Sequence, residues 1–289
     1  MSKSIFQLAE HPWLSLLIVA LAEAVGQIVA GVLIVGLFKQ PRDARATQFA
    51  ISLLGHVLVL FVLVPFVLGL PGGKPSYGAY LDAIRLTRVR PVARLLLLGL
   101  SCYLILALCQ ASGVFIYRAL EAKPVTGAFV RGVFDLSGEL PPKSLGWLVS
   151  LPTALEEVAF RGVLLSVFLR AYPERPAILF TALGFGAIHI LNLASGRETV
   201  WVVGQVAWAA ILGLFYGFVV VRSDSLLPAM VVHYLGNLFV GSLTAYLQTN
   251  APLTTQVLYG ISFTFGAIPT VLMSLWVVAF TTLWPIAGP

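Results

Sequence analysis

Charged residues are scarce in this sequence: Asp, Glu, Lys and Arg make up 10% of its 289 residues, against about 25% in an average soluble domain. Hydrophobic residues make up 59%, and the mean hydropathy is +0.95. This composition excludes a water-soluble enzyme, a disordered chain and a nucleic-acid-binding domain, so we expect no nucleic acid as a partner. Apolar runs of about 18 residues or more can cross a hydrocarbon core of about 30 Å. The composition therefore indicates a multi-pass integral membrane protein.

Cysteine is also rare, with only Cys102 and Cys109, both inside one apolar run. Seven residues along a helix separate two Cα atoms by about 10 Å of rise. A disulfide needs Cα atoms within about 7 Å. We therefore expect two free, buried thiols.

Long apolar runs predict an all-α polytopic membrane protein with about eight transmembrane helices. The runs cover residues 13–38, 46–70, 95–117, 144–169, 176–194, 200–221, 226–247 and 256–286. Outer-membrane strands are excluded, because they would alternate in polarity over about 10 residues. We divide the chain into N-terminal transmembrane helices with a basic amphipathic loop (1–140), a helical core (141–250) and a C-terminal transmembrane helix (251–289).

The loop at 71–94 is strongly basic, with only Asp82 as an acidic residue. Its arginines are Arg85, Arg88, Arg90 and Arg94. The apolar residues Tyr80 and Ile84 recur at helical spacing, which predicts a short basic helix lying on lipid headgroups. Basic residues are divided almost evenly between the two sides of the membrane. With eight spans, both termini lie on the same side of the membrane as this loop, which is the most densely basic one. Placing the loop in the cytoplasm therefore places both termini there as well.

Six ionisable side chains lie deep within apolar runs. They are Glu23, Glu156, Glu157, Arg161, His189 and His233. A charged side chain at mid-membrane costs about 2.5–3.5 kcal/mol on insertion scales, and such residues usually mark a functional site. We therefore expect most of them to face a polar cavity inside the bundle.

The two adjacent glutamates are predicted to have different roles. Glu157 and Arg161 are four residues apart and can form an ion pair on one helix face. Glu156 is rotated by about 100° from Glu157, which leaves it free to act as a general base. As an alternative, Thr153-x-x-Glu156 fits a capping box, in which Glu156 would bond the amide of Thr153.

Two other runs carry polar residues at helical spacing. Phe185 and His189 are four residues apart, as are His233 and Asn237, so each pair shares a helix face. Asn192 follows one turn after His189 and is interpreted as a cap or turn residue. Three helices therefore bring polar groups towards one place in the bundle.

The motifs Glu156-Glu157-x-x-x-Arg161, Phe185-x-x-x-His189 and His233-x-x-x-Asn237 occur in this order on three membrane helices. In this the sequence resembles the CPBP family of intramembrane proteases. That family includes the CAAX prenyl endopeptidases of the Rce1 type and relatives tied to bacteriocin immunity. The resemblance covers residues 150–240, and the first 140 residues carry no matching motif.

The resemblance implies a glutamic endopeptidase whose catalytic core is 141–250. Glu156 and His189 would activate a water, and His233 and Asn237 would stabilise the oxyanion. Glu157 and Arg161 would give structural support. The substrate would be a membrane-associated or lipidated protein or peptide, and membrane lipid is the other expected partner.

Several alternatives stay open at this stage. We prefer a mechanism without a cofactor, although Glu156, His189 and His233 could ligate zinc in a zinc metalloprotease. A non-enzymatic transporter, or an immunity or partner-binding protein, could use the same scaffold. Glu23 is left out of the site. It could be a gating or relay group, or a structural partner of Arg161. His56 is interpreted as a packed or cavity-facing histidine.

Overall fold

The computed structural model describes residues 10–37, 39, 45–67, 77–135, 150–194, 196–250 and 255–286. These parts are helical and contain no strand. Six helices among them are long and apolar enough to cross a membrane. The predicted all-α polytopic membrane fold is therefore confirmed.

The helices follow the apolar runs of the sequence. In chain order they are α1 (Pro12–Gly31) with a π-helical extension (Val32–Leu37), α2 (Arg45–Val57) with a π-helix (Leu58–Leu63) and α3 (Val64–Val67), α4 (Tyr77–Ala83), α5 (Val92–Leu120), α6 (Gly127–Val133), α8 (Leu151–Glu157) with a π-helix (Val158–Leu164) and α9 (Leu165–Ala171), α10 (Glu174–Ile188) with a 3₁₀ turn (His189–Leu193), α11 (Thr199–Ser223), α12 (Leu227–Asn250) and α13 (Thr255–Leu283).

The predicted count of eight transmembrane helices is not confirmed and stays a prediction. The six apolar spans are Pro12–Leu37, Ala46–Leu63, Val92–Leu120, Glu174–Leu193, Thr199–Ser223 and Gly266–Leu283. The run predicted at 144–169 gives α8, the π-helix and α9; α8 carries the two glutamates of the first motif, and the π-helix carries its arginine. The run at 226–247 gives α12, of which Leu227–Gly241 is a shorter apolar segment.

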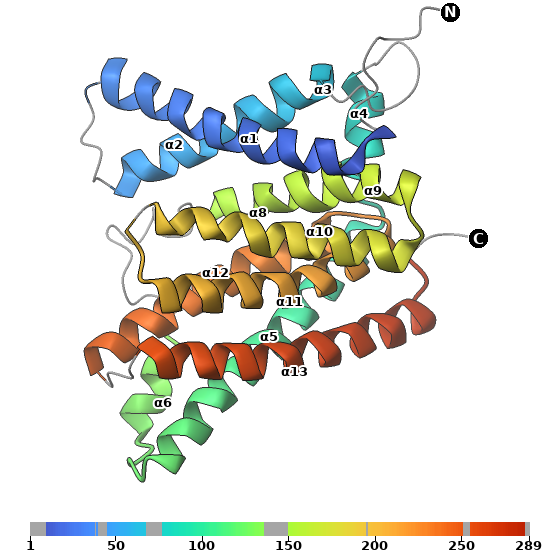
Figure 1. The fold of residues 1–289 in the computed structure, drawn as a ribbon. Helices are drawn as coiled ribbons and strands as arrows, with labels where there is room; N and C mark the ends of the chain where they lie inside the picture. Colours follow the sequence, from blue (N-terminus) through green and yellow to red (C-terminus); the bar gives the residue numbers. More distant parts are fainter. Residues whose placement is uncertain are drawn as a thin grey trace, which may run out of the picture.

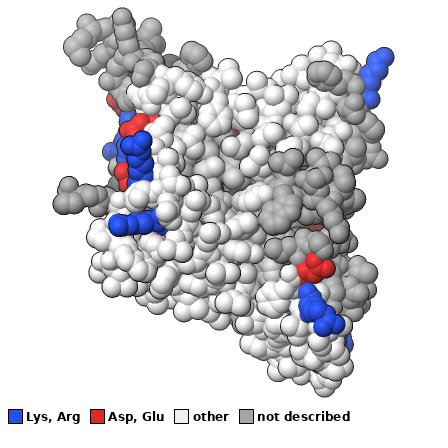
Figure 2. Space-filling view, turned by 180° about the vertical axis from the view of Figure 1, so that it is seen from behind, with Lys and Arg blue, Asp and Glu red and all other residues white. Residues whose placement is uncertain are grey.

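The helices form one bundle, in which α1 and α2 cross at one side and α5 and α13 lie at the other (Figure 1). The segment α8–α12 lies between them. The start of α1 and the end of α13 lie at the same end of the bundle (Figure 1). Seen from behind, charged side chains gather at opposite ends of the molecule, with a wide uncharged belt between them (Figure 2). This arrangement fits a bilayer around the belt.

Glycines let α11 pack very closely against α10. A Cβ on Gly213 would lie 3.0 Å from the Cβ of Ala182, and one on Gly217 would lie 2.9 Å from Ile178. This is the close approach that small residues spaced four apart allow between membrane helices. A Cβ on Gly213 would also lie 3.0 Å from Nη2 of Arg161, so this glycine makes room for the guanidinium.

The basic segment around α4 is more deeply buried than the sequence predicted. Tyr80 and Ile84 are buried in the core of the bundle, and the Tyr80 hydroxyl donates to the carbonyl of Leu60 at 2.6 Å. The expected helix lying with its apolar face on the headgroups is therefore wrong. Its apolar residues gain more from packing against the other helices than from an interfacial position.

Two of its arginines bind acidic residues of the protein. Arg85 and Arg88 both donate to the carboxylate of Asp224, which caps α11 in the left-handed conformation. Arg88 also pairs with Asp82 at 3.0 Å, and this guanidinium holds the pKa of the Asp82 carboxyl below its usual range. The segment is thus fastened to the loop that follows α11.

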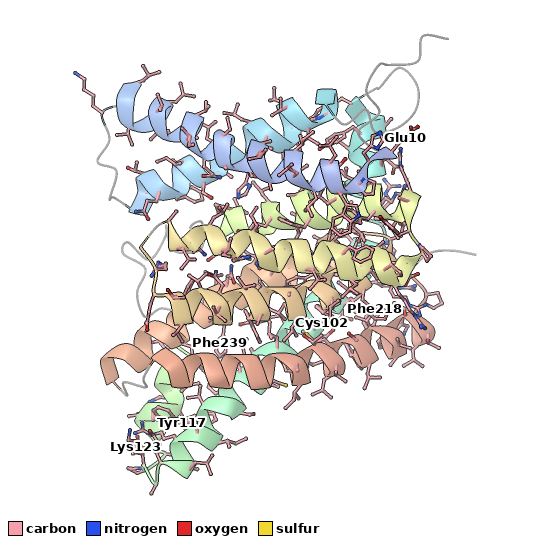
Figure 3. All side chains as sticks on the ribbon, viewed as in Figure 1. Glu10, Cys102, Tyr117, Lys123, Phe218 and Phe239 are labelled. Atoms are coloured by element: carbon pink, nitrogen blue, oxygen red, sulfur yellow. The ribbon has the colours of Figure 1, made fainter. Side chains whose placement is uncertain are left out.

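Both cysteines are free thiols, as predicted, but only Cys102 is buried as expected, and Cys109 is partly exposed. Cys102 lies in the interior of the bundle (Figure 3). Glu10 and Phe218 lie near one end of the molecule, and Tyr117 and Lys123 near the other (Figure 3).

Candidate active site

A pocket of about 330 Å³ lies between the α1–α2 pair and the α8–α11 segment. Its volume falls within the range of about 300–1,000 Å³ found for small-ligand sites. Its lining residues are Ala20, Glu23, Ala24, Gln27, His56, Glu156, Ala159, Phe160, Phe185, Ile188, His189, Leu191, Asn192 and Gln205. The pocket is therefore formed by both the predicted N-terminal region and the predicted core.

The two adjacent glutamates have different surroundings. The side chain of Glu156 is 30% exposed and lines the pocket, whereas that of Glu157 is fully buried. Oε1 of Glu157 accepts from Nη1 of Arg161 at 3.2 Å and contacts Nδ1 of His233 at 2.7 Å. The predicted Glu157–Arg161 ion pair is confirmed.

Arg161 is held by aromatic rings as well as by its ion pair. Its side chain is fully buried, and its guanidinium carbon lies 4.2 Å from the ring centre of Phe185 and 5.2 Å from that of Tyr216. A desolvated cation over an aromatic face gains about 2 kcal/mol. These contacts offset part of the cost of burying the charge and hold Arg161 beside Glu157.

The start of α8 leaves Glu156 free of any capping role. Ser150 is the N-cap, and both the amide and the hydroxyl of Thr153 donate to its carbonyl, at 3.1 and 2.7 Å. The capping-box alternative is therefore wrong, because the amide that Glu156 would bond already has a partner. A π-helix follows directly at Val158–Leu164, and π-helical turns are frequent at functional sites.

The environment of His189 determines its tautomer. Nδ1 lies 2.7 Å from the carbonyl oxygen of Phe185. A carbonyl only accepts, so Nδ1 carries the proton and donates it to this oxygen. In the neutral ring, Nε2 is then an acceptor. Since His189 lines the pocket, this nitrogen is available to a water or a substrate there.

His233 links the two glutamates. Its Nδ1 contacts Glu157, and its Nε2 lies 4.0 Å from Oε2 of Glu156. Its ring stacks on Tyr216 with centroids 5.1 Å apart and lies edge-on to Phe185 at 5.8 Å. These contacts hold the imidazole in one orientation.

The structure brings three of the four predicted catalytic residues together. Glu156 and His189 line the pocket, and His233 lies behind Glu156 without lining it. Asn237 lies one turn further along α12, is exposed, and does not line the pocket. The expected convergence of all four on one cavity is therefore only partly met.

Sequence reasoning missed a second acid–histidine pair in the same pocket. Nδ1 of His56 lies 2.8 Å from Oε2 of Glu23, and both side chains are about 90% buried, with 11% and 9% exposure. Glu23 is thus a partner of His56 and not of Arg161. The available signal was that each residue is ionisable, lies in mid-span and has no partner on its own helix.

Asn192 lies in the 3₁₀ turn that follows α10, in line with its interpretation as a turn residue, but its side chain also makes a contact that was not predicted. Its side chain donates to Oε1 of Gln205 on α11 at 2.7 Å, and both residues line the pocket. It therefore links two helices and does not serve as a helix cap.

The described residues contain no group of three His, Cys, Asp or Glu side chains arranged to hold a metal ion. The set Glu156, His189 and His233 required by the zinc alternative is not assembled as such a group. The preference for a mechanism without a cofactor stays a prediction.

The structure is thus that of a polytopic membrane protein whose helical bundle surrounds a pocket lined by a partly exposed glutamate and a histidine. Residues 141–239 match the family described as type II CAAX prenyl endopeptidase Rce1-like. This part of the chain is therefore similar to the Rce1-like family, and the resemblance seen in the motifs is confirmed. Comparisons with curated proteins and with solved structures gave no match. The matched segment holds all three motifs, whereas Glu23 and His56 lie outside it.

Proposed function

We propose that the protein is an intramembrane endopeptidase that hydrolyses a peptide bond of a membrane-associated or lipidated substrate. One observation carries this proposal. Of two adjacent glutamates, Glu157 is buried and paired with Arg161, while Glu156 is accessible in a pocket that also holds His189. The Rce1-like domain supports the same activity, because its family is described as prenyl endopeptidases.

In the proposed mechanism, Glu156 takes a proton from a water as the water oxygen attacks the peptide carbonyl carbon. Nε2 of His189 accepts a hydrogen bond from the same water and orients it. The carbonyl electrons move to the oxygen, the C–N bond then breaks, and the nitrogen takes up a proton. The products are a carboxylic acid and an amine, and no metal takes part.

The oxyanion needs hydrogen-bond donors, and we assign them to His233 and Asn237. Nδ1 of His233 donates to the Glu157 carboxylate, so in this proposal the ring acts as an imidazolium whose Nε2–H, on the nitrogen nearer to Glu156, donates to the oxyanion. Asn237 follows one turn later on the same helix, and its side chain is exposed, so a bound substrate can approach it. Such donors typically contribute about 10²–10³-fold to kcat.

The test compares the peptides in membranes that contain the wild type, Glu156→Gln or Glu174→Gln. The first substitution removes the base at nearly constant size, and the second changes an exposed glutamate at the start of α10 as a matched control. We expect a cleavage product that disappears in Glu156→Gln and persists in Glu174→Gln. A product pattern that is the same in all three membranes would overturn the proposal and favour the non-enzymatic alternative.

A further inference from the structure

Glu23 and His56 form a second acid–histidine pair in the wall of the pocket that holds Glu156. Glu23 comes from the middle of α1 and His56 from the end of α2, and the two side chains meet at 2.8 Å. Both line the pocket that Glu156 also lines. The pair therefore shares this pocket with the proposed general base.

The pair is not needed to hold α1 against α2. The two helices already touch through glycines: a Cβ on Gly26 would lie 3.1 Å from the carbonyl oxygen of Gly55. The side-chain amide of Gln27 also donates to the carbonyl of Ser52 at 3.3 Å. Two buried ionisable groups cost several kcal/mol in a membrane, so a purely structural pair would add cost where packing already suffices.

Peptide hydrolysis needs a proton donor for the leaving nitrogen, and the roles proposed so far assign this step to no residue. Glu156 takes a proton from water, and His189 presents Nε2 as an acceptor. His233 is buried behind Glu156 and bound to Glu157. The amine nitrogen must gain a proton as the C–N bond breaks, because an amide anion is a very poor leaving group. A donor at the opposite wall of the pocket would supply it.

We propose that His56 is a further catalytic residue, the general acid that protonates the leaving nitrogen, and that Glu23 is its positioning residue. This proposal rests on the proposed function. With Nδ1 against the Glu23 carboxylate, Nε2 is the ring nitrogen left to face the pocket. The Glu23 carboxylate stabilises the imidazolium, Nε2–H gives its proton to the nitrogen, and the C–N electron pair becomes the amine lone pair. The proton that Glu156 took from the water then passes to His56 and restores the imidazolium. Water is therefore the only reagent consumed.

The experiment varies the leaving group, because an acid is needed only for a poor one. The probes are an N-acetyl-S-farnesyl-cysteinyl tripeptide and the p-nitrophenyl ester of N-acetyl-S-farnesyl-cysteine, whose leaving group departs as a stable anion. We expect His56→Gln to lower kcat on the peptide by about 10²–10⁴-fold, the usual contribution of a general acid. Its kcat on the ester should fall by less than about fivefold, because the p-nitrophenolate leaves as a stable anion and needs no proton donor.

Glu23→Gln gives a second, milder variant that keeps an acceptor for Nδ1 but removes the charge. We expect about a tenfold fall in kcat on the peptide, unchanged KM and an unaffected ester reaction. His11→Gln, at an exposed histidine before α1, is the matched control and should match the wild type on both probes.

Three results would overturn the proposal. One is an equal loss on peptide and ester in Glu23→Gln, which would indicate a structural role. Another is undiminished peptide cleavage in His56→Gln. If the wild type cleaves neither probe in a Glu156-dependent way, the proposed function itself fails, and the assignment of His56 fails with it.

Discussion

Replacing Arg161 by alanine should destabilise the protein far more than replacing Glu156 by glutamine. Arg161 is fully buried and is bound to Glu157, which is also fully buried. Removing one partner of a buried ion pair costs about 3–5 kcal/mol, because the other charge is left without compensation. For a chain of this size that corresponds to a fall in Tm of roughly 10 °C. Glu156 is partly exposed, and its isosteric replacement should stay within about 0.5 kcal/mol.

Thermal unfolding of the purified protein in detergent measures both effects. Arg170→Ala is the matched control, since Arg170 lies on the same helical segment but is exposed. We expect its Tm to stay close to that of the wild type, while Arg161→Ala unfolds well below it and is recovered in lower yield. A wild-type Tm for Arg161→Ala, or an equal fall for Glu156→Gln, would refute the division of roles between the two glutamates.

Three further predictions follow from particular residues. Asn237→Ala should lower kcat by about 10²–10³-fold in a protein that purifies without stoichiometric zinc; one zinc per chain with a mild effect of this substitution would support the metalloprotease instead. Gly213→Ala should destabilise the bundle by about 1–3 kcal/mol in thermal unfolding, because its Cβ would lie 3.0 Å from Arg161, and an unchanged Tm would contradict this. The Arg88 guanidinium lowers the pKa of Asp82, so the stability that Asp82 contributes is present above its unfolded pKa and is lost as pH falls through the lower folded value. Acidification below about pH 4 should therefore lower the Tm of the wild type slightly more than that of Asp82→Asn, and an equal fall in both would show that this pair contributes nothing.

The sequence predicted those parts of the fold and site that depend on local spacing. Apolar length predicted the helices, and the spacing of four residues predicted the pair of Glu157 and Arg161, since such residues are neighbours on any helix. The spacing of the two cysteines along one helix likewise predicted that both thiols are free.

Contacts between helices could not be predicted in this way. Glu23 and His56 lie on different helices, and Arg85 and Asp224 are 139 residues apart, so no spacing rule relates the partners of either pair. The position of Asn237 depends on how α12 is rotated in the bundle. That rotation is determined by packing against α5 and α8 and is not encoded in the motif itself.

The pocket has walls from two sources: the segment 141–239, which carries the motifs, and the helices α1 and α2, which lie outside it. Selection can therefore alter the substrate-facing surface of α1 and α2 while the residues proposed for water activation stay the same. A chimera that joins α1 and α2 of one such protein to the motif-bearing helices of another would exchange selectivity and retain the chemistry. For the same reason, the motif-bearing segment produced by itself would expose Glu156 to lipid.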